Sequence, residues 1–367
     1  MTARPPAPSL GRATLLVAER EIVSQVRTKS FLVSTAILLV GVLAAIVVSS
    51  VMSGREQDDV PVAVVQQVAG QVASADGLAL SEVPDRDAAE QAVRDGDVDA
   101  AVVPGDGPRG VEVLAMQEAP GVLLEALTER PDVELLDPAA AEGPVRYAVT
   151  FGFGFVFMLS AIGFGATIAQ NTVTEKQTRI VEILLSAVPA RALLAGKILG
   201  NSALALGQTA AIAAVSVLAL VVTGQDDVLT MVGMPVVWFV VFFALGFLLL
   251  ASLFAASASL VSRIEDTGVV LQPVMWLTML PYFLIVFFNE NSAVTTAMSY
   301  VPFSAPVGMP VRLFLGEAAW WEPLLSLALL AGACVVVIGV AARIYERSVL
   351  RMGARVKVGE VLRGAAD

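Results

Sequence analysis

The chain has 367 residues, of which 56% are hydrophobic and 16% charged, with a formal net charge of −11 and a mean hydropathy of +0.77. This composition lies outside the range of soluble globular proteins and indicates a membrane protein. The chain has no histidine and a single cysteine, Cys334. A Cys/His zinc site, a Ser-His-Asp triad and an internal disulfide framework are therefore excluded.

Six apolar runs are long enough to cross the hydrocarbon core of a bilayer, which takes about 20 helical residues. They are the segments 31–52, 147–170, 198–222, 231–261, 268–288 and 323–342. The first run is longer than the apolar part of a secretory signal peptide. We therefore interpret it as an uncleaved membrane anchor.

The positions of lysine and arginine predict the orientation of these six spans. Basic residues gather in segments 1–30, 171–197 and 343–367, whereas the two short loops on the opposite side hold only Arg312. Cytoplasmic loops of membrane proteins carry the excess of basic residues. Both termini are therefore expected in the cytoplasm.

Segment 53–146 reads as a small soluble domain between the first and second spans. Strand-like runs (VPVAVVQ, DAAVV, VEVLAM) alternate with helix-like runs (DAAEQAVRDG, GVLLEALTER), and Pro, Gly and Asp separate them. Its many acidic residues form either an ordinary solvated surface or one that selects cations or a partner.

The predicted fold is an all-α membrane bundle of six transmembrane helices, with this extracytoplasmic α/β domain inserted between the first and second spans. The predicted parts are a cytoplasmic N-terminus with the first transmembrane helix, the α/β domain, spans two to six with a cytoplasmic coupling loop at 171–197, and a cytoplasmic tail. Their residues are 1–52, 53–146, 147–343 and 344–367.

The charged stretch TEKQTRIVEILLSAVPARALLAGK, residues 174–197, is too polar to span a membrane. Thr174 and Gln177 match a capping box, which predicts that a helix starts there, and Pro189 ends the pattern. The segment is therefore expected to form a short amphipathic cytoplasmic helix.

Charge along this helix bears on what it contacts. Glu175, Arg179 and Glu182 follow one another at helical spacing, so acids alternate with bases on one face. A helix that lies on lipid headgroups is typically rich in Lys and Arg, whereas a helix that inserts into the groove of a protein need not be. The pattern favours a cytoplasmic protein partner over the lipid surface.

The stretch TEKQTRIVEILLSAVPARALLAGKILG resembles the cytoplasmic loop of type-2 ATP-binding-cassette exporter permeases, in the subgroup of sodium-efflux and drug-export permeases. Three further stretches agree in the same order, namely AVRDGDVDAAVVPG, YVPFSAPVGMPVR and AARIYERSVLRMG. The resemblance implies that the loop helix contacts a separate ATPase subunit. The contact residues it implies are Glu175, Lys176, Arg179, Glu182, Leu184 and Leu185.

The same resemblance implies a membrane-spanning permease subunit of an exporter, in which two permease copies, identical or related, work with two cytoplasmic ATPase subunits in a bacterial plasma membrane. ATP and magnesium are then expected on the partner. Gly196-Lys197 does not form a phosphate-binding loop of this chain's own, because Arg191 stands where the first glycine belongs and Ile198 where the hydroxyl belongs. No cofactor, metal or nucleic acid is expected on the chain itself.

Prolines at four-residue intervals, Pro302, Pro306 and Pro310, argue against an ordinary continuous helix after the fifth span. With Arg312 they form a candidate outer gate, built from a broken or re-entrant element. The alternative is an interfacial loop anchored by two tryptophans, Trp320 and Trp321.

Polar residues within the spans are few, and Asn201, Gln208 and Gln272 are the candidates for a substrate route. Hydrogen bonding between helices explains them equally well. The span centres hold essentially no ionisable residue, which disfavours a proton- or ion-coupled transporter.

Three classes of function are weighed, of which two remain and one is disfavoured. The first is the exporter permease, for which sodium, a hydrophobic drug, a lipid and a peptide all remain open as substrates. The second is a membrane-anchored ligand-binding or sensor protein that acts through its ectodomain. An intramembrane enzyme is disfavoured because the usual acid-base groups are missing.

Overall fold

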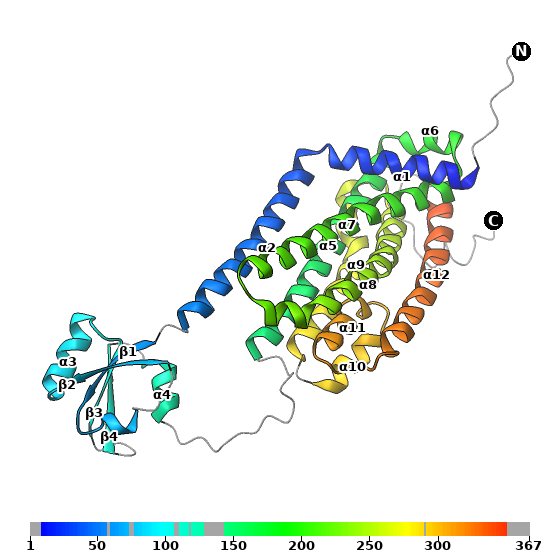
Figure 1. Ribbon diagram of the computed structural model, residues 1–367. Helices are drawn as coiled ribbons and strands as arrows, with labels where there is room; N and C mark the ends of the chain where they lie inside the picture. The colour runs from blue at the N-terminus through cyan, green and yellow to red at the C-terminus, as the bar shows by residue number, and fades with distance from the viewer. Residues whose placement is uncertain are drawn as a thin grey trace, which may run out of the picture. The chain divides into compact units, whose positions relative to one another are not determined.

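The computed structural model describes residues 9–56, 59–72, 77–105, 110–116, 119–127, 143–289 and 291–350 (Figure 1). The chain divides into two compact units, one formed by Met1–Ala44 with Ala139–Asp367 and the other by Ala45–Pro138. The predicted C-terminal tail lies outside the described residues from position 351 onward.

The first unit is helical. Its helices are α1 (Leu10–Val26), α2 (Lys29–Glu56, which continues into the second unit), α5 (Gly143–Gln177), α6 (Ile180–Ala187), α7 (Ala190–Val222), α8 (Asp226–Ser259), α9 (Thr267–Phe287), α10 (Ser292–Tyr300), α11 (Ala305–Phe314) and α12 (Glu322–Ser348). A short 3-10 turn, η3 (Ile264–Asp266), leads into α9.

The six predicted spans are confirmed as helices long and apolar enough to cross a membrane. They are Lys29–Val51, Arg146–Gln177, Ala190–Val222, Val228–Ser259, Ile264–Phe287 and Glu322–Ser348. Each contains most of a run predicted from hydropathy, and several extend further at the charged end, because helical hydrogen bonding does not stop where the apolar run stops.

Helix α8 is central, since it packs against α5, α7, α11 and α12. Phenylalanines of α5 and α8 interlock along the contact, with Phe157 and Phe243 ring centroids 5.7 Å apart and edge to face. Small residues let the backbones approach: a Cβ on Gly165 of α5 would come within 2.4 Å of the Phe254 ring. This is the close packing expected of helices in lipid, where small residues admit large neighbours.

The segment between α9 and α12 forms two short helices, α10 and α11, and the helical structure is interrupted between them at residues 301–304. Pro302 lies in the break, as its missing N–H and fixed φ allow. The expectation of a broken segment holds there, but α11 runs without interruption through Pro310. All of α11 except Leu313 is buried, mainly against α8 and α10.

The second unit contains a four-stranded mixed sheet in the order β2-β1-β3-β4. Strand β1 (Val60–Val65) is parallel to β2 (Leu78–Val83) and β3 (Ala100–Pro104), and β3 is antiparallel to β4 (Val111–Ala115). A 3-10 turn, η1 (Ala69–Gln71), follows β1, and two helices complete the described part, α3 (Arg86–Asp95) and α4 (Gly121–Leu127).

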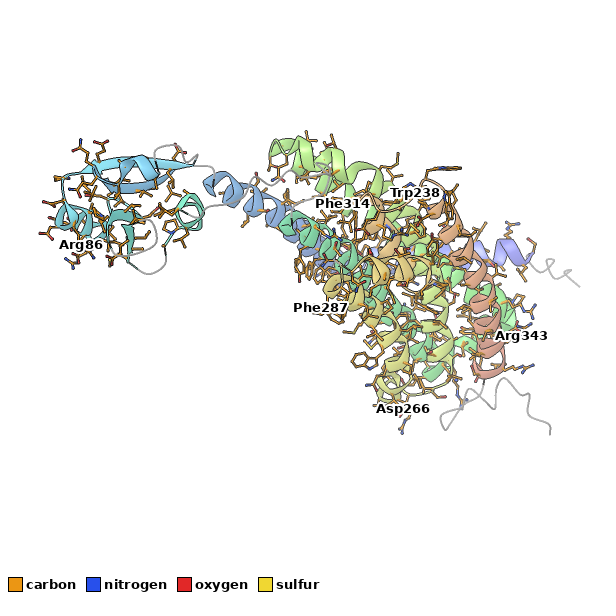
Figure 2. All side chains as sticks on the ribbon, turned by 90° about the horizontal axis from the view of Figure 1, so that it is seen from below. Arg86, Trp238, Asp266, Phe287, Phe314 and Arg343 are labelled. Atoms are coloured by element: carbon orange, nitrogen blue, oxygen red, sulfur yellow. The ribbon has the colours of Figure 1, made fainter. Side chains whose placement is uncertain are left out.

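Local signals in the sequence account for α3. Asp85 caps its start by accepting a hydrogen bond from the Ala88 N–H, and Gly96 ends it in the left-handed conformation at φ 78°. Figure 2 shows the Arg86 side chain at the surface of this unit, where it pairs with Glu112 of β4 at 2.8 Å. Valines and alanines of β1 and β3 form the core against α3 and α4.

Candidate functional site

The charged stretch 174–197 does not begin a helix at Thr174, so the predicted capping box is wrong. Residues 174–177 are the last turn of α5, because the helix of the second span continues past its apolar run to Gln177. The break comes at Arg179, which adopts a left-handed conformation at φ 60°. Helix α6 starts one residue later, and Pro189 precedes α7.

Glu175 consequently points into the protein rather than along the surface of a loop helix. Its carboxylate lies 2.6 Å from Arg20 Nη2 and 2.8 Å from Lys197 Nζ, and its side chain is only 14% exposed. The predicted succession of surface charges along one helix is therefore wrong for Glu175. Its partners come from α1 and α7, which lie 155 and 22 positions away in the sequence.

These contacts are part of a group of four charged residues at the junction of α1, α5 and α7. We call it the charge cluster, and its members are Arg20, Glu21, Glu175 and Lys197. Lys197 Nζ lies 3.3 Å from Glu21 Oε1, and both side chains are nearly inaccessible, at 1% and 4% exposure. Two cations balance two carboxylates, which is what charged groups out of water require.

Glu21 sits on α1, outside the spans, and two effects act on its carboxyl. Burial by itself raises the pKa of Glu21, but the charges of Lys197 and Arg20 and their hydrogen bonds outweigh it and hold the pKa below its ordinary value of 4.5. Glu21 is therefore ionised at neutral pH.

Helix α1 can approach the cluster closely because two glycines of α7 leave room for it. A Cβ on Gly196 would come within 2.4 Å of Val17 Cβ, and a Cβ on Gly200 within 2.8 Å of the Ala18 carbonyl oxygen. The GKILG motif thus supplies two glycines four residues apart as a seat for α1, with Lys197 beside them. Hydropathy could not find α1, since at 17 residues it is too short and too charged to span.

Lys176, next to Glu175, is completely buried and faces the opposite way. Its ammonium group donates to the carbonyl oxygens of Ser259 at 2.7 Å and Ser348 at 2.8 Å, which end α8 and α12. A cation is favoured at the negative end of a helix dipole, and here two such ends share one. Lys176 is therefore not available as a surface contact.

The last turn of α5 is thus bound on two sides by adjacent residues. Glu175 ties it to α1 and α7, and Lys176 ties it to the ends of α8 and α12. Figure 1 shows α6 and α1 at the same end of the bundle. Arg343, labelled in Figure 2, lies on the exposed side of α12 near the same end.

Helix α6 itself is short and exposes much of its surface. Of the other residues implied as partner contacts, Arg179 and Glu182 are exposed, and Leu184 and Leu185 are half-buried. Ile183 is 71% exposed, and Ile180 is 44% exposed. Only Val181 of this helix is buried. This eight-residue helix therefore presents two exposed isoleucines next to the exposed charges of Arg179 and Glu182.

The residues of the candidate outer gate lie together on the α10–α11 segment. Pro306 and Pro310 are buried, and Pro302 is half-buried. Arg312, 4% exposed, forms an ion pair with Glu322 and donates to Ser299 Oγ at 3.1 Å and to the Glu317 carbonyl at 2.8 Å.

Acidic partners of this arginine were not identified from the sequence. Glu322 also accepts from the Tyr300 hydroxyl at 2.8 Å, and Glu317 pairs with Arg146 of α5 at 3.2 Å. Together they tie the start of α5 and the start of α12 to α10 and α11. The pattern of prolines and an arginine singled out the segment, but no local feature of the sequence showed which residues Arg312 would contact.

The three candidate route residues do not converge. Asn201 is buried and donates to the Lys197 carbonyl at 3.0 Å, within its own helix. Gln272 is exposed on α9. Gln208 borders a cleft of about 420 Å³ between α2, α5 and α7. Of the three, Gln208 is therefore the residue that borders this cleft.

Gly196 and Lys197 do not form a nucleotide site, because both lie inside the continuous helix α7 and face α1. Within the part of the chain that the structure describes, no three His, Cys, Asp or Glu side chains are grouped so that they could hold a metal ion.

Comparison with known proteins gives a family. Residues 29–343 match the family described as ABC-2 family transporter protein. The uncharacterized protein YhaP of Bacillus subtilis (strain 168) is 31% identical over 212 residues, which are 54% of this chain and 50% of that protein. The uncharacterized protein MJ1024 of Methanocaldococcus jannaschii is 28% identical over 201 residues, 54% of this chain and 49% of that protein.

The chain thus spans about half the length of these curated relatives. No solved structure matches the chain. The family match, by contrast, begins with the first span and ends within the last one, so that it takes in all six. The chain therefore belongs to the ABC-2 family of transporter proteins and is a multi-pass membrane component of a transporter.

Proposed function

We propose that the chain is the permease subunit of an ATP-driven exporter, and that a separate cytoplasmic ATPase subunit binds it at α6. The ATPase carries the ATP and magnesium, and its motion is passed to the spans to move substrate outward. A second permease copy, identical or related, completes the pathway.

One observation carries this proposal. Helix α6 leaves Ile183 71% exposed, and it directly follows a helix end that is fixed to four other helices by Glu175 and Lys176. A force applied to α6 is therefore passed to the end of α5, which its contacts hold firmly to the other helices. An isolated surface helix on a slack loop would not transmit such a force.

Membrane orientation follows from the same end of the bundle. Basic residues are concentrated in segments 1–30, 171–197 and 343–367, which supports a cytoplasmic position for α1, α6 and the end of α12. The predicted α/β domain at 53–146 is then extracytoplasmic, and the family resemblance implies that the membrane is a bacterial plasma membrane. Sodium efflux and drug export are the two activities that the sequence resemblance suggests.

The test is purification of the tagged chain from its native host in mild detergent, with ATPase activity measured in the eluate. One variant exchanges the charges exposed beside α6 (Arg179→Glu with Glu182→Arg), and a second places a charge on its apolar face (Ile183→Asp). None of these three side chains belongs to the charge cluster, so both variants should fold normally.

A matched control exchanges Arg263→Glu with Glu265→Arg. These two residues are 74% and 72% exposed at η3, on the same predicted side of the membrane, and their ion pair is 4.0 Å long. Loss of the ATPase from both α6 variants but not from the control supports the proposal. An unmodified chain that brings down no ATPase under several mild conditions contradicts it and favours a ligand-binding or sensor protein instead.

A further inference from the structure

The cleft beside Gln208 has features that select a class of ligand. It lies between α2, α5 and α7, measures about 420 Å³, and is bordered near the α1–α2 corner by Gln25 and Ser30. That volume is in the range of small-molecule sites, roughly 300–1,000 Å³. Phe31 and Phe164 both border the cleft, and their rings meet edge to face with centroids 6.1 Å apart.

Depth in the membrane can be judged from the helices that line the cleft. Along α5 the lining extends from Leu159 to Thr167, which are eight positions apart and therefore separated by about 12 Å at 1.5 Å per residue. This length is more than a third of the thickness of a hydrocarbon core, which is about 30 Å. A ligand would enter it from the lipid phase.

Charge is the first selective feature. None of the side chains that border the cleft is ionisable. A sodium ion needs oxygen ligands, usually with a carboxylate among them, and a lipid phosphate needs Arg or Lys nearby. The cleft offers hydroxyl and amide oxygens but no carboxylate and no basic side chain, so a small cation and a phosphate headgroup are both poorly matched to it.

Two polar groups at the inner end are the second selective feature. Ser160 is 3% exposed, and its hydroxyl has no hydrogen-bond partner among the described residues. Gln208 borders the cleft at the same end, where Ile37, Leu38 and Leu159 supply the apolar wall. An acyl chain would leave this hydroxyl and amide unsatisfied, which costs free energy at membrane depth.

We infer that the cleft binds a neutral, largely apolar small molecule that carries hydrogen-bonding groups and is dissolved in the bilayer. The inference rests on the proposed transport function only in its consequence, since it would make such compounds the substrate class and drug export the better match than sodium efflux. The binding itself is a property of this chain alone.

Gly163 makes the cleft easy to fill. It lies on the cleft wall of α5, and a Cβ added there would meet nothing within 4 Å. Gly152 is a matched control, because it lies on the same helix away from the cleft and its Cβ would also meet nothing within 4 Å. Gly163→Leu should therefore occupy the cleft without disturbing packing, and Gly152→Leu should leave the cleft open.

The experiment uses the purified chain in lipid nanodiscs without any ATPase, with the neutral dye Nile red as the probe and its saturable emission change as the readout. Gly163→Leu should weaken binding about tenfold or more, as expected when one side chain competes for an apolar pocket, and Gly152→Leu should not. Gln208→Leu should weaken the binding of Nile red, because this dye accepts hydrogen bonds. It should not weaken the binding of pyrene, an aromatic hydrocarbon without such an acceptor.

Two results would overturn the inference. Equal dye affinity in Gly163→Leu and the unmodified chain would place binding elsewhere. A phospholipid that stays bound in native mass spectrometry to the unmodified chain, but not to Gly163→Leu, would assign the cleft to a lipid chain. Because no ATPase is present, failure of either proposal leaves the other standing: a lost dye site says nothing about α6, and a lost ATPase says nothing about the cleft.

Discussion

Removal of the Lys197 charge should release α1 from the rest of the protein. Lys197→Met leaves Glu21 and Glu175 with Arg20 alone, at 2.8 Å and 2.6 Å. Breaking a buried ion pair costs about 3–5 kcal/mol, because the remaining charge has lost its partner out of water. Since one cation stays in contact with both carboxylates, we expect the lower end, about 3 kcal/mol.

That loss can be measured as hydrogen exchange. At about 1.4 kcal/mol per factor of ten, the backbone amides of α1 should exchange roughly a hundredfold faster in Lys197→Met. A matched control is Arg191→Met on the same helix: Arg191 is 66% exposed and pairs with Glu346, and exposed pairs contribute about 1 kcal/mol or less. Its effect on α1 should be negligible.

Rescue separates charge from packing. The double variant Lys197→Met with Glu21→Gln has one carboxylate, Glu175, for one cation, Arg20, and should recover most of the lost protection. If Lys197→Met leaves α1 exchange unchanged, or if the double variant is worse than the single one, the reasoning about charge balance is refuted.

Three further predictions concern the same end of the bundle. Gly200→Leu should displace α1 and speed its exchange, because even a Cβ would come within 2.8 Å of the Ala18 carbonyl, whereas Gly207→Leu, with nothing within 4 Å, should not; equal effects would contradict the seat. Lys176→Met strips two buried carbonyls of their donor, at about 1–3 kcal/mol each, and should fray the ends of α8 and α12 in an exchange experiment, with α9 unaffected. The lowered pKa of Glu21 means that its contribution is fully present above about 4.5 and is lost as the pH falls below that value, so α1 exchange, corrected for its intrinsic pH dependence, should rise there and should not rise in Glu21→Gln.

The spans were predictable because each is a property of one continuous stretch. Twenty apolar residues must be satisfied within a single helix in lipid, so hydropathy alone located all six. The strand-like runs that begin at Val60, Asp99 and Val111 likewise fall in β1, β3 and β4. Strand β2, LALSEV, was missed, since its alternation is weak and four of its residues are exposed.

Side-chain direction at the candidate site could not be predicted in the same way. Whether Glu175 faces a loop or the protein depends on where α5 ends, and that depends on partners distant in the chain, Arg20 in one direction and Ser348 in the other. A capping box is a local signal, and here tertiary packing overrode it. The family resemblance pointed to this loop but could not say which of its residues faces outward.

The two carbonyl groups that accept hydrogen bonds from Lys176 are synthesised at different times during translation. Its own helix and the Ser259 carbonyl are made before the sixth span, but the Ser348 carbonyl is added only as that span is completed. A chain that stopped after the fifth span would have its first five helices inserted, yet would bury an ammonium group with one acceptor in place of two. Truncated products of this protein should therefore carry a defect at the end of α5 itself, far in sequence from the missing part.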